Sequence, residues 1–185
     1  MPGVPDRPIT PDTSITPDTK DWTWVLERPC PECGFDASSF AREAVPEMIR
    51  SNAAAWRVVL GRPDAAQRPA EGRWSPLEYA CHVRDVFRLF DERLAVMLAE
   101  DDPMFANWDQ DVTAVEDRYA EQVPATVADE LAFAGAGIAA SFAAVQGTEW
   151  GRLGRRSDGA SFTVETFARY FVHDPIHHLW DVEHR

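Results

Sequence analysis

Positive charge, cysteine and long apolar runs are all scarce in this chain. Its 18 Lys and Arg residues are outnumbered by 31 Asp and Glu residues, which gives a formal net charge of −13. Such a chain is repelled by phosphate backbones and anionic lipid, so nucleic acids and membranes are not expected partners. No apolar run approaches the roughly 18 residues of a spanning helix, and the N-terminus lacks a signal-peptide pattern. We therefore expect a cytoplasmic protein.

The three cysteines are too few for a disulfide framework. Two of them form Cys30-Pro-Glu-Cys33-Gly34, the shape of a zinc knuckle, in which the glycine frees backbone amides to point at sulfur. A structural zinc ion needs four ligands, and no second Cys-x-x-Cys exists. Cys81, which adjoins His82, could complete such a site together with one histidine. A reduced packed pair, a metal knuckle and a redox pair are all compatible with the motif.

Composition divides the chain into three parts. Residues 1–20 contain a repeated Ile-Thr-Pro-Asp-Thr sequence and little to bury, which predicts a disordered or loosely attached tail. Residues 21–37 hold two tryptophans and the Cys-x-x-Cys motif, and we expect them to pack onto the main body. Residues 38–185 are long enough for a single core.

Four amphipathic segments are spaced along residues 38–185. We expect the first helix from Ser38 or Ser39 to Leu60, the third over about 125–146, and the last after Thr163. No strand-like alternation is present, and a long acidic link joins the second segment to the third. These features predict an all-α four-helix bundle with a long crossover between helices 2 and 3.

The second helix has the clearest start signal. Ser75 is a natural N-cap, Pro76 suits the first helical position, and Glu78 completes a capping box. Trp74 and Tyr79 occupy the two positions of a hydrophobic staple. This helix carries His82 near its beginning.

Four of the five histidines lie in the last thirteen residues. His173 and His177 are four residues apart, so both imidazoles leave one face of a helix. Two such imidazoles can share a divalent cation with a ligand from another helix, and His82 is the only histidine elsewhere. His178 lies about 140° from His173 around an ideal helix and is not expected to bind.

Two carboxylates accompany these histidines at helical spacing. Asp85 follows His82 by three residues, and Asp181 follows His177 by four. Each can reach the second imidazole nitrogen, as carboxylates beside metal-bound histidines commonly do.

Other polar residues are candidates for the substrate. Arg155 and Arg156 precede the last helix and could bind a carboxylate or phosphate, or could simply be solvated in a loop. Asp109 and Glu116 of the crossover are candidates for a general base. No residue is identified as catalytic by the sequence.

The run from Trp74 to His82 resembles the start of the second helix in the DinB superfamily, and His173-Asp-Pro-Ile-His177-His178 resembles the histidine motif of that superfamily's last helix. The likeness covers about residues 38–185. It implies a four-helix bundle that holds a divalent metal, zinc or nickel, through His82, His173 and His177. The Cys30–Cys33 segment is not part of the family pattern.

The resemblance also implies a function, because members of the superfamily include bacillithiol transferases and mycothiol-dependent maleylpyruvate isomerases. It favours a metal-dependent enzyme that transfers or activates a low-molecular-weight thiol on a small electrophilic substrate. The alternatives are a hydrolase that uses a metal-bound water, a non-catalytic metal-stabilised binding protein, and a purely structural metal with Cys30 and Cys33 among its ligands. The expected partner is a small molecule, and a homodimer is compatible with the sequence.

Overall fold

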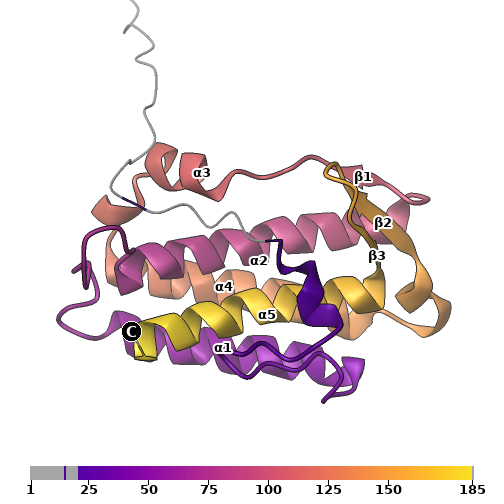
Figure 1. Ribbon diagram of the computed structural model, residues 1–185, viewed down its shortest axis with the longest axis horizontal. Helices are drawn as coiled ribbons and strands as arrows, with labels where there is room; N and C mark the ends of the chain where they lie inside the picture. The colour runs from indigo at the N-terminus through magenta and orange to yellow at the C-terminus, as the bar shows by residue number, and fades with distance from the viewer. Residues whose placement is uncertain (1–14, 16–20, 185) are drawn as a thin grey trace, which may run out of the picture.

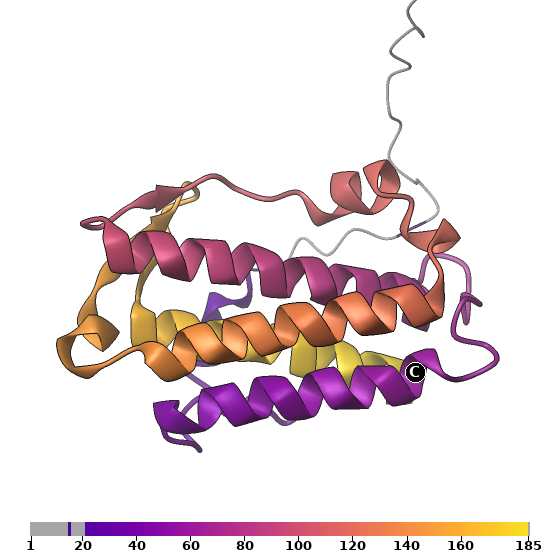
Figure 2. The same cartoon turned by 180° about the vertical axis from the view of Figure 1, so that it is seen from behind.

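The computed structural model describes Ile15 and residues 21–184, so the predicted tail lies outside the described residues except for Ile15. Four long helices form the bundle seen in Figures 1 and 2, which confirms the predicted fold. They are α1 (Val45–Leu60), α2 (Pro76–Ala99), α4 (Pro124–Ala144) and α5 (Val164–His184). The largest completely buried side chains, among them Trp56, Phe87, Phe142 and Phe171, fill the space between the helices.

Helix α4 packs closely against α1 and α2 because its centre is rich in Ala and Gly. A Cβ atom at Gly135 would lie 3.0 Å from both Ala53 and Phe87, closer than most real Cβ contacts, so glycine favours this close approach. By length and composition α4 is also the one described helix that could cross a membrane, with a mean hydropathy of 1.3. A core helix can pass the same test, and α4 contributes Leu131 and Ile138 to the core of the bundle.

The predicted start of α2 is confirmed in detail. Ser75 Oγ accepts a hydrogen bond from the Glu78 amide at 3.2 Å, and Glu78 Oε2 accepts one from the Ser75 amide at 2.8 Å. The start of α1 differs from the prediction, since residues 42–44 form a 3-10 turn and the α-helix begins at Val45. Pro46 explains this, because proline is compatible with the first turn of a helix and not with its interior.

The crossover between α2 and α4 contains β1 (Met104–Phe105) and α3 (Gln110–Glu116). β1 pairs in parallel with β2 (Leu153–Arg156), which pairs antiparallel with β3 (Ser161–Thr163). This small sheet joins the crossover to the loop before α5. It was not predicted, because strands of two to four residues are too short to show an alternating pattern.

The segment before α1 lies across α5 (Figure 1). It begins with a 3-10 helix, η1 (Trp22–Leu26), whose Val25 is completely buried. Cys30 and Cys33 follow in a tight turn, and Cys30 is also buried. Residues 21–37 therefore cover one side of α5 and reach the middle of that helix.

Candidate metal centre

Helix α5 carries two pairs of ligand-type residues at i,i+4 spacing, and the pairs are one residue out of step. His173 pairs with His177, and Asp174 pairs with His178. Each pair meets residues from a different element, so two clusters form in which all ligand atoms lie within 4.8 Å of one another. We call His82, Asp174 and His178 the pocket centre, and Cys30, Cys33, His173 and His177 the cysteine centre.

His82 is the residue that α2 contributes to the pocket centre. The residue is completely buried, its Nε2 lies 3.5 Å from Asp174 Oδ1, and its ring stacks on Trp108 of the crossover at 5.4 Å. Within the described part of the chain neither ring nitrogen of His82 has a hydrogen-bond partner. Buried polar atoms are nearly always satisfied, and a metal ion beside Asp174 would satisfy one of these nitrogens. The residues present therefore fit a metal.

His178 is oriented by a second carboxylate. Its Nδ1 lies 3.3 Å from Asp181 Oδ2, and its Nε2 lies 3.7 Å from Asp174 Oδ2. A carboxylate at Nδ1 favours a proton on that nitrogen and leaves the lone pair of Nε2 directed at the centre. This is the usual arrangement of a metal-binding histidine with a supporting carboxylate.

Asp174 supplies the negative charge of the pocket centre. Burial would raise its pKa, but the imidazoles of His178 and His82 outweigh burial and hold that pKa below its usual range. Asp174 is therefore a carboxylate at neutral pH. Two imidazoles and one carboxylate suit zinc and other first-row divalent ions, and three protein ligands leave coordination positions for water or substrate.

Three residues of the cysteine centre, Cys30, His173 and His177, are buried. Cys30 Sγ lies 3.7 Å from His177 Nδ1. Burial and the neighbouring His177 lower the pKa of His173 to about 4, so its imidazole is neutral at pH 7. Burial raises the pKa of the Cys33 thiol to about 11.

The structure divides the predicted triad between these two centres. His82 groups with Asp174 and His178, whereas His173 and His177 group with the two cysteines. Metal binding by His82, His173 and His177 together stays a prediction. The angles around α5 relate the histidines only to one another and do not include Asp174. The spacing of Asp174 to His178 repeats the spacing of His173 to His177, and this repetition is the signal that could have identified Asp174.

Two further expectations are corrected. Asp85 does not orient the nearby imidazole, because it accepts hydrogen bonds from Tyr119 Oη at 2.7 Å and from Arg84 Nε at 2.9 Å. Cys81 lies apart from the other two cysteines and donates to Gln122 Oε1 at 3.5 Å. Both side chains connect α2 to the end of the crossover instead of supporting a metal.

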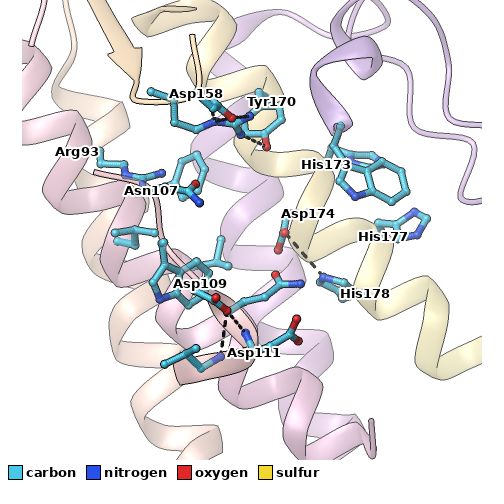
Figure 3. A pocket seen from close by; sticks show the side chains of 18 residues that line it. Arg93, Asn107, Asp109, Asp111, Asp158, Tyr170, His173, Asp174, His177 and His178 are labelled. Carbon is cyan, nitrogen blue, oxygen red and sulfur yellow. Dashed lines mark hydrogen bonds and ion pairs between the residues drawn. The ribbon is translucent and has the colours of Figure 1, made fainter. Parts of the chain in front are cut away.

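A pocket of about 590 Å³ adjoins both centres, because Asp174 and His178 line it together with His173 and His177. Figure 3 shows Asp174 and His178 on its α5 side, and Asn107 and Asp109 on its crossover side. Trp22 of the N-terminal segment also lines it. The volume is in the range of small-molecule sites in proteins.

Two guanidinium groups line the same pocket, those of Arg93 and Arg156. Burial lowers the pKa of Arg93, and the positive charge of Arg156 lowers it further. Asp158 holds Arg156 in place at 2.6 Å. Arg155, predicted together with Arg156, is not part of the wall and pairs with Asp102 at 3.0 Å. Arg93 was not anticipated from the sequence.

Of the two acidic candidates in the crossover, Asp109 lines the pocket and Glu116 does not. Asp109 Oδ1 accepts hydrogen bonds from the amides of Asp111 and Val112 at 3.0 Å, as the N-cap of α3. The cap fixes the position of the Asp109 carboxylate in the pocket wall.

Comparison with known proteins identifies one matching family and one solved structure with a similar fold. The family profile described as DinB superfamily matches residues 47–182, a region that contains the pocket centre and begins after the two cysteines. The solved structure of YfiT from Bacillus subtilis, described as "a probable metal-dependent hydrolase with an unusual four-helix bundle topology", is similar with a TM-score of 0.68. The likeness covers 79% of this chain and 89% of that chain at 14% sequence identity. No match was found among curated proteins.

Proposed function

This chain belongs to the DinB superfamily, and we propose that it is a metal-dependent hydrolase of small molecules whose metal is held by His82, Asp174 and His178. One observation carries the proposal. A completely buried imidazole without a hydrogen-bond partner in the described chain faces a carboxylate that lies in the wall of a pocket. That combination is typical of a metal site with access for substrate.

The residues of the site have distinct roles in this proposal. A divalent ion, zinc or nickel, would supply Lewis acidity, which lowers the pKa of a water or thiol and polarises a substrate carbonyl or phosphoryl oxygen. His82 and His178 would each supply one ring nitrogen, and Asp181 favours the tautomer of His178 that carries its proton on Nδ1. Trp108 stacks on His82 and shields the ligand set from solvent. Asp109, on the crossover side, is the candidate that accepts a proton from the nucleophile.

The cationic residues indicate the kind of substrate. Arg93 and Arg156 bring two positive charges to the pocket wall, where Arg156 pairs with Asp158 at 2.6 Å and lies 3.9 Å from Asp21. A guanidinium group binds carboxylate or phosphate groups well. We therefore propose a substrate that carries an anionic group beside the bond to be cleaved.

Thiol transfer is the second candidate. A pocket of about 590 Å³ is larger than a small ester requires and leaves room for a low-molecular-weight thiol beside an electrophile. The same ligand set would then lower the pKa of that thiol. The two candidates share the metal and differ in the nucleophile.

The test uses the metal-loaded protein with Asp174→Ala and His178→Ala, and His184→Ala as the matched control. His184 is an exposed histidine on the same helix. Exchangeable metal per chain is measured together with hydrolysis of p-nitrophenyl acetate and of p-nitrophenyl succinate, and conjugation of cysteine to monochlorobimane. We expect both variants to lose one metal equivalent and at least about 100-fold in kcat/KM, since even the supporting carboxylates of such sites contribute 10–100-fold. Full metal content in both variants would contradict the proposal.

A further inference from the structure

We propose that Cys30, Cys33, His173 and His177 bind a zinc ion in a closed tetrahedral site, which fastens residues 21–37 to α5. This site is separate from the pocket centre, and the inference does not rest on the proposed hydrolase. Two of the four ligands lie outside the region that matches the family. The site would therefore be an addition to the bundle rather than a part of it.

The separations of the donor atoms suit zinc. All four ligand atoms lie within 4.8 Å of one another, and Cys30 Sγ is 3.7 Å from His177 Nδ1. For ordinary Zn–S and Zn–N bonds at a tetrahedral angle, the sulfur–nitrogen separation is about 3.6 Å. This pair already has the spacing that a shared zinc ion requires.

Backbone hydrogen bonds close the turn that carries the thiols. The Gly34 amide donates to Cys30 O at 2.9 Å, and the Cys30 amide donates to Phe35 O at 2.8 Å. Gly34 has a φ of +73°, a conformation that glycine adopts at little cost. The closed turn brings both thiols to the same pair of histidines on α5.

The histidines give the second, independent indication of a ligand. His173 is 3% exposed, and in the described chain its Nε2 has no hydrogen-bond partner. Trp22 and Phe35 cover this imidazole, with ring centroids 5.1 and 5.3 Å away. A buried imidazole nitrogen that has no hydrogen-bond partner in the described chain is costly unless it binds something.

His177 is oriented for the same ion. Its Nδ1 faces the sulfur of Cys30, and its Nε2 lies 3.7 Å from Asp181 Oδ2. One ring nitrogen towards the ligand cluster and the other towards a carboxylate is the arrangement found in zinc-binding histidines.

The other interpretations of the cysteine motif explain less. A redox-active Cys-x-x-Cys commonly lies at the start of a helix, which lowers the pKa of its first thiol. Here Cys33 ends a turn, and α1 does not begin until Val45. A merely packed pair of thiols would not account for two imidazoles at ligand distance. Four protein ligands leave no position for substrate, so the ion would be structural.

A structural ion here would also shape the pocket. Trp22 belongs to the segment that carries the thiols, lies over the rings of His173 and His177, and lines the pocket. Fastening residues 21–37 to α5 would therefore hold one pocket wall in place.

The test begins with the wild-type protein loaded with Co²⁺ in place of zinc. Thiolate ligation produces sulfur-to-cobalt charge-transfer bands in the near ultraviolet and intense visible bands of tetrahedral cobalt. In a second measurement, a thiol-specific mercurial is added to the zinc protein and released zinc is measured with a chromogenic chelator. The variants are Cys33→Ser and His173→Ala, with Cys81→Ser as the control, because Cys81 is a buried cysteine outside the cluster.

We expect charge-transfer bands in the wild type, in Cys81→Ser and in His178→Ala, and their loss in Cys33→Ser. The mercurial should release one equivalent of zinc from the wild type. If Cys33→Ser does not fold, the wild-type spectrum and the mercurial titration decide. Absence of the bands in the wild type, or an intact-mass loss of two hydrogens that shows a Cys30–Cys33 disulfide, overturns the proposal. Retention of the bands in His178→Ala separates this result from any failure of the pocket centre.

Discussion

The two centres on α5 are one residue apart in helical register, and they differ in donor atoms and in the element that completes each of them. The pocket centre combines two imidazoles with a carboxylate and adjoins a pocket of about 590 Å³. The cysteine centre combines two imidazoles with two thiols and lies beneath Trp22 and Phe35. A step of one residue turns a side chain by about 100° around a helix, enough to present it to a different neighbour. The neighbouring element then decides the chemistry, α2 on one side and residues 21–37 on the other.

One residue contacts both centres. Asp181 Oδ2 lies 3.3 Å from His178 Nδ1 and 3.7 Å from His177 Nε2, and Asp181 is 6% exposed. In each case it faces the ring nitrogen that would not bind the metal. A single carboxylate thus supports one histidine of an open site and one of a closed site, so the two sites are not independent.

The strongest test of this comparison is Asp181→Asn. Loss of the carboxylate should weaken metal binding at both centres by about 10–100-fold, because both histidines lose the group that orients the ring and raises its basicity. Competition with a chromogenic chelator measures the affinities of the two centres, and the cobalt bands identify the cysteine centre. Glu183→Gln, which removes a charge from an exposed position on the same helix, is the control. A change at only one centre would assign Asp181 to that centre alone.

A second prediction concerns the pocket side only. Arg156→Ala should raise KM for p-nitrophenyl succinate by about 10-fold, the equivalent of one charge-assisted hydrogen bond, and should change p-nitrophenyl acetate much less. Neither metal affinity should change, since Arg156 contacts Asp158 and Tyr170 and belongs to neither centre.

Arg155→Ala is the matched control for Arg156→Ala, because the adjacent arginine pairs with Asp102 outside the pocket. Equal effects of the two substitutions would indicate a general loss of positive charge. Equal effects of Arg156→Ala on the charged and the neutral ester would remove the case for an anionic substrate.

The sequence predicted what depends on local interactions. Ser75, Pro76 and Glu78 lie within one helical turn, so the start of α2 could be read directly from them. The grouping of the histidines could not be predicted in this way, because it depends on where residues 21–37 cross α5. Helical spacing shows that His173 and His177 share a face, but it does not show whether His82 or the two cysteines face that pair of histidines. Asp174 could have been found, since its spacing to His178 is equally local.

The smallest predicted effect tests whether α2 positions only the pocket centre. α2 supplies His82 to the pocket centre and no ligand to the cysteine centre. Ser75→Ala removes the hydroxyl that accepts from the Glu78 amide and donates to Glu78 Oε2 at 2.8 Å. Loss of such a cap costs about 1 kcal/mol, which corresponds to a decrease in Tm of about 2–4 °C for a chain of this size. The effect stays small because Glu78 still accepts from the Ser75 amide and remains paired with Arg68.

Metal affinity at the pocket centre should fall by at most about five-fold in Ser75→Ala, the equilibrium equivalent of that ~1 kcal/mol, and the cobalt bands of the cysteine centre should not change. Ser141→Ala is the control, because Ser141 lies within α4 and its hydroxyl donates to the carbonyl of Gly137 in its own helix, so its removal should change stability by less than about 0.5 kcal/mol. Thermal melts and chelator competition measure both quantities. If Ser75→Ala weakens the cysteine centre as much as the pocket centre, α2 positions both, and the division of labour between α2 and residues 21–37 is wrong.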